Sequence, residues 1–166
     1  MALLVPANFP TPGADIASSF FNAVHTYDAK LVQVIVGVVP IIGFGPDTLI
    51  RMSRSQDTFR KVVGCFGEVT RIMNKDTTGE LTIDLMQTSE SNAFLSILQY
   101  VDELGKFAVV PIFIIDLSGG SFGLSMSGWI RKPPELVFNK GLELRRWTFD
   151  LATVDVVQLG NLALAI

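Results

Sequence analysis

Hydrophobic and polar residues alternate along much of this chain, and residues 79–86 show the pattern most clearly. The apolar residues of this segment fall on one side of an extended strand and the polar residues on the other: Leu81, Ile83 and Leu85 against Glu80, Thr82 and Asp84. One buried face and one solvated face are typical of an antiparallel sheet. Further strands are predicted in "KLVQVIVGVV", "TLIRMSRS", "EVTRIMNK", "FAVVPIFIID", "SFGLSMSGWI", "ELVFN" and "LELRRWTFDL".

A single helix is predicted at about residues 89–104. Ser89 or Ser91 can accept the first free amide hydrogens, and Gly105 is expected to end the helix. The apolar residues at helical spacing are expected to pack on the sheet: Phe94, Ile97, Leu98, Val101 and Leu104. Seven or eight strands and one helix predict a mostly β fold, a β-sandwich or barrel subunit with one flanking α-helix.

The chain divides into three parts by pattern. Residues 1–26 form an N-terminal arm with three prolines, residues 27–155 form the β-sandwich domain, and residues 156–166 form an apolar C-terminal tail. Within the arm, Asp15 can cap a short helix with an apolar stripe. Because that stripe is brief, the arm is expected to dock on something rather than to stand alone.

The composition is apolar for a domain of 166 residues, with 49% hydrophobic and 17% charged residues and a mean hydropathy of +0.43. A membrane helix needs roughly 18 consecutive apolar residues, and the longest apolar segments here are broken by Pro40 or Pro111. No Lys or Arg precedes the first apolar run, so no secretory signal is expected. We interpret the excess of apolar residues as an interface between copies of the chain.

The net charge of −3 argues against tight, sequence-reading contact with nucleic acid.

Chemistry-bearing residues are sparse. His25 is the single histidine and Cys65 the single cysteine, which excludes a histidine-based triad, a multi-histidine metal site and an intrachain disulfide. The stretch "LSGGSFG" lacks the ending of a phosphate-binding loop and is interpreted as a hairpin turn. We therefore predict no enzyme, no catalytic residue, no metal and no cofactor. Arg51, Arg71 and Arg146 are expected to form cross-strand ion pairs.

Three long stretches resemble the tail tube proteins of contractile-tailed bacteriophages and prophages. The most specific segments are "DTFRKVVGCFGEVTR", "GELTIDLMQTSESNAFL" and "WIRKPPELVFNK", and the resemblance runs from about Tyr27 to Leu151. It implies a virion protein that forms hexameric rings, stacked with further copies into a tube through which DNA passes. In such a tube, four strands of each subunit would line the channel in one continuous barrel. The implied partners are the tail sheath, baseplate, tail terminator and tape measure proteins.

Two site hypotheses follow from this resemblance. The first is a channel lining, acidic or neutral so that DNA does not stick, formed by Glu80, Thr82, Asp84, Thr70, Thr148 and Asp150. The second is a ring-stacking loop in segment 55–68, which carries apolar residues where a loop should be polar: Phe59, Val62, Val63 and Phe66.

Two alternatives remain open. The chain can be a related tube or tube-initiator protein of a pyocin-like or secretion machine, because such machines share one architecture. A different class is a small β-sandwich binding module for carbohydrate or peptide, which would use an exposed aromatic cluster. Trp129 and Trp147 are available for that role, but we expect Trp147 in the core.

Overall fold

A computed structural model describes residues 28–47 and 50–159. The predictions for the arm at 1–26, and for the tail beyond residue 159, lie outside these residues. Ten strands, a short 3-10 helix η1 (Ala29–Leu31) and one α-helix, α2 (Ser91–Gly105), make up the described part. The strands are β1 (Val32–Val36), β2 (Val39–Ile41), β3 (Ile50–Arg54), β4 (Phe59–Val63), β5 (Val69–Met73), β6 (Gly79–Met86), β7 (Val110–Asp116), β8 (Phe122–Lys132), β9 (Leu144–Leu151) and β10 (Asp155–Val157).

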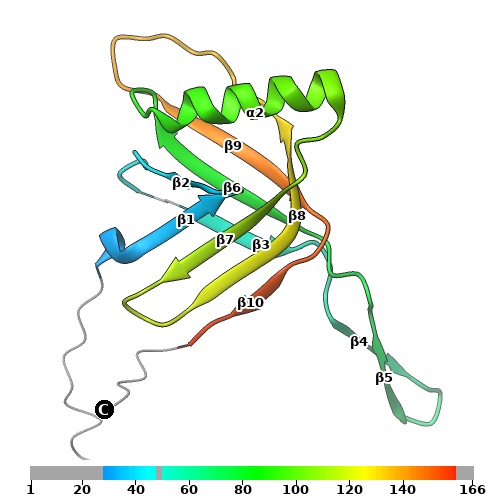
Figure 1. Cartoon of the computed structure of the whole chain (residues 1–166). Coiled ribbons are helices and arrows are strands. Elements are labelled where there is room, and N and C mark those ends of the chain that lie inside the picture. The colour runs from blue at the N-terminus through cyan, green and yellow to red at the C-terminus, as the bar shows by residue number, and fades with distance from the viewer. Residues whose placement is uncertain (1–27, 48–49, 160–166) are drawn as a thin grey trace, which may run out of the picture.

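Eight strands form one antiparallel sheet in the order β2-β1-β7-β8-β9-β6-β3, with β10 paired to the first half of β8. The sheet curls, so that β1 and β7 lie in front of β3, β6 and β9 (Figure 1). The two halves pack closely at Gly123 on β8, where an added Cβ would lie 2.8 Å from the sulfur of Met52 on β3 and would displace that side chain. Arg54 holds the same end of the curl through a 2.9 Å hydrogen bond from its Nε to the carbonyl of Val154.

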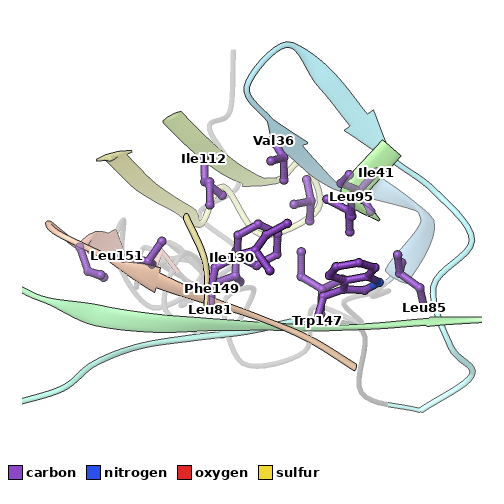
Figure 2. Close-up of a cluster of buried hydrophobic side chains, with 13 residues drawn as sticks. Val36, Ile41, Leu81, Leu85, Leu95, Ile112, Ile130, Trp147, Phe149 and Leu151 are labelled. Carbon is purple, nitrogen blue, oxygen red and sulfur yellow. The ribbon is translucent and has the colours of Figure 1, made fainter. Parts of the chain in front are cut away.

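The core lies between the two halves of the curled sheet. Side chains from β6 and β9 point toward those of β1, β2 and β7 (Figure 2). The buried set confirms the predicted alternation on β6 and the predicted burial of Trp147, with its largest members being Trp147, Phe149, Leu81, Ile83, Leu85, Leu95, Ile112 and Leu151. A mostly β fold with one flanking helix is therefore confirmed.

Helix α2 lies across one end of the sheet (Figure 1) and buries only part of the face that its sequence predicts. Leu95 is fully buried, and Phe94 and Leu98 pack against the core. Ile97, Val101 and Leu104 are exposed instead, with Leu104 at 72%. The helix ends one residue later than predicted, since Lys106 rather than Gly105 adopts the left-handed conformation, with φ of 58°.

The segment at 55–68 is not a loop, contrary to prediction. It contains β4, which pairs with β5 in a separate two-stranded hairpin. The hairpin projects away from the rest of the molecule (Figure 1). Its base is closed by hydrogen bonds from the Ser55 amide to the Thr78 carbonyl, 2.9 Å, and from the Asn74 amide to the Thr58 carbonyl, 2.8 Å.

Three smaller differences concern strand boundaries. The predicted strand "ELVFN" lies in the connection between β8 and β9 and is not a strand. The single strand predicted across "KLVQVIVGVV" is a tight hairpin, because Gly37, with φ of 67°, turns the chain from β1 into β2. Strand β10 extends across the boundary between residues 155 and 156, where the domain was expected to end and the tail to begin.

Candidate functional site

The outward face of β3, β6, β9 and the second half of β8 is polar. On β6 and β9 the register places Glu80 opposite Asp150, Thr82 opposite Thr148 and Asp84 opposite Arg146. On the flanking strands, Arg51 of β3 lies opposite Thr82, and Lys132 of β8 lies opposite Thr148. Since directly opposed residues share a face, these side chains form one surface over four adjacent strands. We call it the polar face.

Arg131 links two of the acids on the polar face. Its Nε donates a 2.9 Å hydrogen bond to Asp150 Oδ1, its Nη2 contacts the same oxygen, and its Nη1 lies 2.7 Å from Glu80 Oε2. The hydrogen bonds to Asp150, and then to Glu80, raise the pKa of the Arg131 guanidinium above its usual value. Without Arg131 the two opposed carboxylates would repel each other across the strands.

Arg146 pairs with Asp84 in a two-point contact. Its Nε donates to Asp84 Oδ1 at 2.7 Å and its Nη2 donates to Asp84 Oδ2 at 2.9 Å. The Asp84 side chain is only 7% exposed, whereas that of Arg146 is 69% exposed. The hydrogen bonds to Asp84 raise the pKa of the Arg146 guanidinium. This contact confirms the cross-strand ion pair predicted for Arg146; within residues 28–47 and 50–159, Arg51 and Arg71 form none.

The polar face differs from the predicted lining in two respects. Thr70 is not part of it, because Thr70 lies on β5 of the separate hairpin. The face also carries basic side chains that were not among the predicted residues: Arg51, Arg131, Lys132 and Arg146 lie beside the acidic Glu80, Asp84 and Asp150.

The β4–β5 hairpin carries an exposed apolar surface. Phe66, at its turn, is 97% exposed, and Val63 beside it is 58% exposed. Arg71 lies over the ring of Phe59, 4.2 Å from its centre, which is a cation–π geometry. The structure thus brings the predicted apolar residues together on one projecting arm, joined by four that were not predicted: Val69, Ile72, Met73 and Cys65.

Two further apolar surfaces are open to solvent. One is the outer stripe of α2 with the residues that follow it: Ile97, Tyr100, Val101, Leu104, Phe107 and Val109. The other is the outward face of β7 and the first half of β8, where Phe113 lies opposite Leu124 and Ile115 opposite Phe122. Large contiguous apolar surfaces of this kind mark interaction sites.

The described residues offer little for catalysis. Among them, no group of three or more His, Cys, Asp or Glu side chains is close enough to hold a metal ion. No helix of the described part is both long and apolar enough to cross a membrane.

Comparison with known proteins identifies the family. The sequence model described as "Bacteriophage PhiTE tail tube protein" matches residues 42–160, well over half of the chain. The chain belongs to this tail tube family. A curated relative, the "Structural protein ORF10" of Pseudomonas phage KPP10, is 30% identical over 123 residues, 73% of this chain and 71% of the relative. Membership places the chain among the structural components of phage tails.

Solved structures from contractile injection systems share the fold of this tail tube family member. A chain of the anti-feeding prophage tube-terminating cap matches with a TM-score of 0.58 at 11% identity, over 82% of this chain and 93% of the cap. Chains of the PVC sheath/tube terminator and of the PVC sheath-tube complex match with TM-scores of 0.53 and 0.51, each at 12% identity. They cover 81% and 90% of this chain and 98% and 100% of their own lengths.

Sequence reasoning missed Arg131 as a member of the polar face. The register of β8 and β9 shifts between Ile130 and Lys132, so Arg131 stands at a bulge and does not follow the simple alternation. The signal available in the sequence was "WIRKPP", where two basic residues follow a strand just before two prolines.

Proposed function

We propose that this chain forms the inner tube of a phage tail, as rings of identical subunits stacked into a filament, and that DNA passes through the central channel. The polar face carries this proposal. It extends over four adjacent strands, its outer strand β3 pairs only with β6 among the described residues, and its polar side chains other than the buried Asp84 are at least partly exposed. A tube built from this chain needs such a face to line its channel.

The strand count explains why copies must combine. The curled sheet of one chain is filled by its own core, including Trp147 and Phe149. A barrel of about eight strands has no room for more than side chains, and a water-filled channel needs about twice that number. Polar strands from several copies can close one wide barrel, and closure also covers the free edge of β3. Six copies per ring, as the resemblance implies, would contribute 24 strands on this proposal.

The exposed apolar surfaces are consistent with contacts between copies. The hairpin arm projects from the connection between β3 and β6, at one end of the polar face. We propose that it reaches the next ring, with Phe59, Val62, Val63 and Phe66 buried there. Head-to-tail contacts of this kind do not close on themselves and therefore generate a filament.

The outer surfaces would then meet other tail proteins. The similar solved structures include a sheath-tube complex, which supports a contractile sheath as the partner around the tube. Baseplate, terminator and tape measure proteins are the further partners on this proposal. The role is structural, without a catalytic step.

A terminator or initiator of the tube is the second candidate, because two of the similar structures are tube terminators. A likeness at 11–12% identity shows the fold and not the position in the tail. The match to a tail tube family supports the tube itself.

Negative-stain electron microscopy of the purified full-length protein tests this assignment. We expect tubes with a central hole, many rings long, because every ring presents the same stacking surfaces. Single rings or short stacks that do not grow with protein concentration would favour a terminator or initiator. A monodisperse single subunit at all concentrations would contradict both readings and favour a small binding module.

Charge substitution on the polar face tests the channel assignment. Thr148→Lys adds a cation at the centre of the face without breaking an ion pair, and Ser96→Lys on exposed α2 is the matched control. We expect particles with Thr148→Lys to eject DNA at least tenfold more slowly, since each added cation can neutralise a phosphate. Particles with Ser96→Lys should eject normally. Equal ejection rates for the two variants would remove the support for a channel lined by this face.

A further inference from the structure

Basic side chains on the polar face are arranged like those of surfaces that bind nucleic acid. Arg51 on β3, Arg146 on β9, and Arg131 and Lys132 on β8 surround the opposed pair Thr82 and Thr148. Arginine guanidinium groups present paired N–H donors that match phosphate oxygens, and clustered cations dominate the affinity of proteins for DNA. By its basic residues alone, this face would hold DNA.

The paired donors of two of these arginines are already occupied. Arg146 directs Nε and Nη2 to the two oxygens of Asp84, which is the same two-point geometry that would bind a phosphate. Arg131 directs Nε and Nη2 to Asp150 and Nη1 to Glu80. Of the four basic residues, Arg51 and Lys132 alone form no ion pair within the described part of the chain.

Burial by itself requires a partner for Asp84, whose side chain is 7% exposed, but stability does not account for the pairing around Arg131. Arg131, Glu80 and Asp150 are each between about a third and a half exposed, and ion pairs at such exposure contribute little to the free energy of folding. Nor do the three carboxylates form, with other described residues, a group that could hold a metal ion. The three acids have one property in common: each carboxylate contacts the N–H donors of an arginine guanidinium.

Resting on the proposed role as a DNA conduit, we propose that Glu80, Asp84 and Asp150 mask Arg131 and Arg146 from phosphate. The carboxylates fill the guanidinium donors of these two arginines, so that duplex DNA meets only Arg51 and Lys132 as unpaired cations and is held weakly. The arginines in turn prevent the acids from repelling DNA or one another. The low affinity of the face thus comes from internal pairing and not from an acidic surface.

Removal of the mask from Arg131 tests this proposal. Glu80→Gln with Asp150→Asn keeps the shape of both side chains but removes their charge. The control, Asp57→Asn with Glu135→Gln, changes the net charge equally at two exposed acids that form no ion pair in the described structure. Binding of a fluorescent 20-base-pair duplex by the full-length protein is measured by anisotropy from about 50 to 200 mM salt, the range over which phosphate contacts weaken.

We expect the unmasked variant to bind the duplex at least tenfold more tightly than the wild type at about 50 mM salt, with a salt dependence steeper by about one unit of log K per log salt. Adding Arg131→Gln to that variant should return the affinity to the wild-type level, and the control variant should not differ from the wild type. Equal affinity of the unmasked and control variants would overturn the proposal. Tight binding by the wild type itself would overturn it as well.

Electron microscopy of the same preparations separates this proposal from the proposed function. If tubes form but unmasking leaves DNA affinity unchanged, the mask is wrong and the tube stands. If the chain forms no tubes yet the unmasked variant alone binds DNA, the tube is wrong, while the masking of Arg131 by Glu80 and Asp150 stands.

Discussion

Replacing Thr58–Asn74 with a short glycine–serine turn should leave a folded subunit that no longer forms tubes. The hairpin is removed at its base, where the Asn74 amide donates to the Thr58 carbonyl, and the bond from Ser55 to Thr78 still closes the chain. Strands β4 and β5 pair only with each other among the described residues, so the large sheet loses no partner. Circular dichroism and urea unfolding would check the fold, and electron microscopy the tubes.

The physical reason is that a two-stranded hairpin is at best marginally stable in water by itself. This one also exposes large apolar side chains along its whole length, from Phe59 through Phe66 to Met73. Exposing such a surface to water is unfavourable, and no other described strand of the subunit pairs with the hairpin. Burial against a neighbouring ring supplies the missing packing.

A double variant tests whether the β4–β5 hairpin acts through its apolar side chains or through its presence alone. Burying a side chain the size of Val or Phe stabilises by about 1.5–3 kcal/mol, and every 1.4 kcal/mol changes an equilibrium constant about tenfold. Val63→Ser with Phe66→Ser should therefore raise the concentration needed for tubes about 100-fold or more. The matched control, Arg60→Ser with Lys61→Ser, shortens two exposed polar side chains of the same hairpin. Tubes that form equally well with both double variants would exclude apolar stacking through the arm.

The core strands of this fold could be predicted because their apolar side chains are buried within the same chain. Leu81, Ile83 and Leu85 alternate with polar residues and are all fully buried, and Trp147 lies where the alternation of β9 places it. The turn between β7 and β8 was likewise predicted from its glycines, and Gly120 has φ of 69° there. Each of these features satisfies its own physical requirement inside the subunit.

The predictions failed where the pattern belongs to a surface that the subunit leaves open. Ile97, Val101 and Leu104 have the spacing of a buried helix face, yet they are exposed and Leu95 is buried instead. A sequence shows which side chains are apolar and favour burial. It does not show whether they are buried by the same chain or by another one. The segment 55–68 failed similarly, because apolar residues on both faces of β4 hide the alternation that identifies a strand.

The candidate polar face was only partly predictable, because charge in a sequence does not show pairing. Glu80, Asp84 and Asp150 were assigned to one face correctly by alternation, but their counter-ions depend on register. Arg146 lies opposite Asp84 only in the observed register of β6 and β9. A shift of two residues would keep the same face outward but would give Asp84 another partner. Arg131 reaches Glu80 and Asp150 through a bulge that no propensity predicts.

The second large effect is expected at Trp147, which is 1% exposed and joins the sheet to the helix. Its Nε1 donates a 3.0 Å hydrogen bond to Asn92 Oδ1, and the side-chain Nδ2 of Asn92 donates in turn to the carbonyls of Met86 and Ser89. One indole thus fills the core and fixes the first turn of α2 over the end of β6.

Trp147→Ala should lower the free energy of unfolding by about 3–5 kcal/mol, because it opens a large cavity and leaves the Asn92 oxygen without its donor. Trp147→Phe keeps most of the volume and should cost about 1–3 kcal/mol, the penalty of an unsatisfied buried acceptor.

Trp129→Ala, at a half-buried position on the outer face, is the matched control and should cost less than either. Urea unfolding at protein concentrations without tubes gives all three values, because assembly would otherwise add to the apparent stability. A domain has only about 5–15 kcal/mol in total, so Trp147→Ala should leave the subunit close to unfolding. A loss no larger than that of Trp129→Ala would mean that the space between the two halves of the sheet is not the centre of this fold.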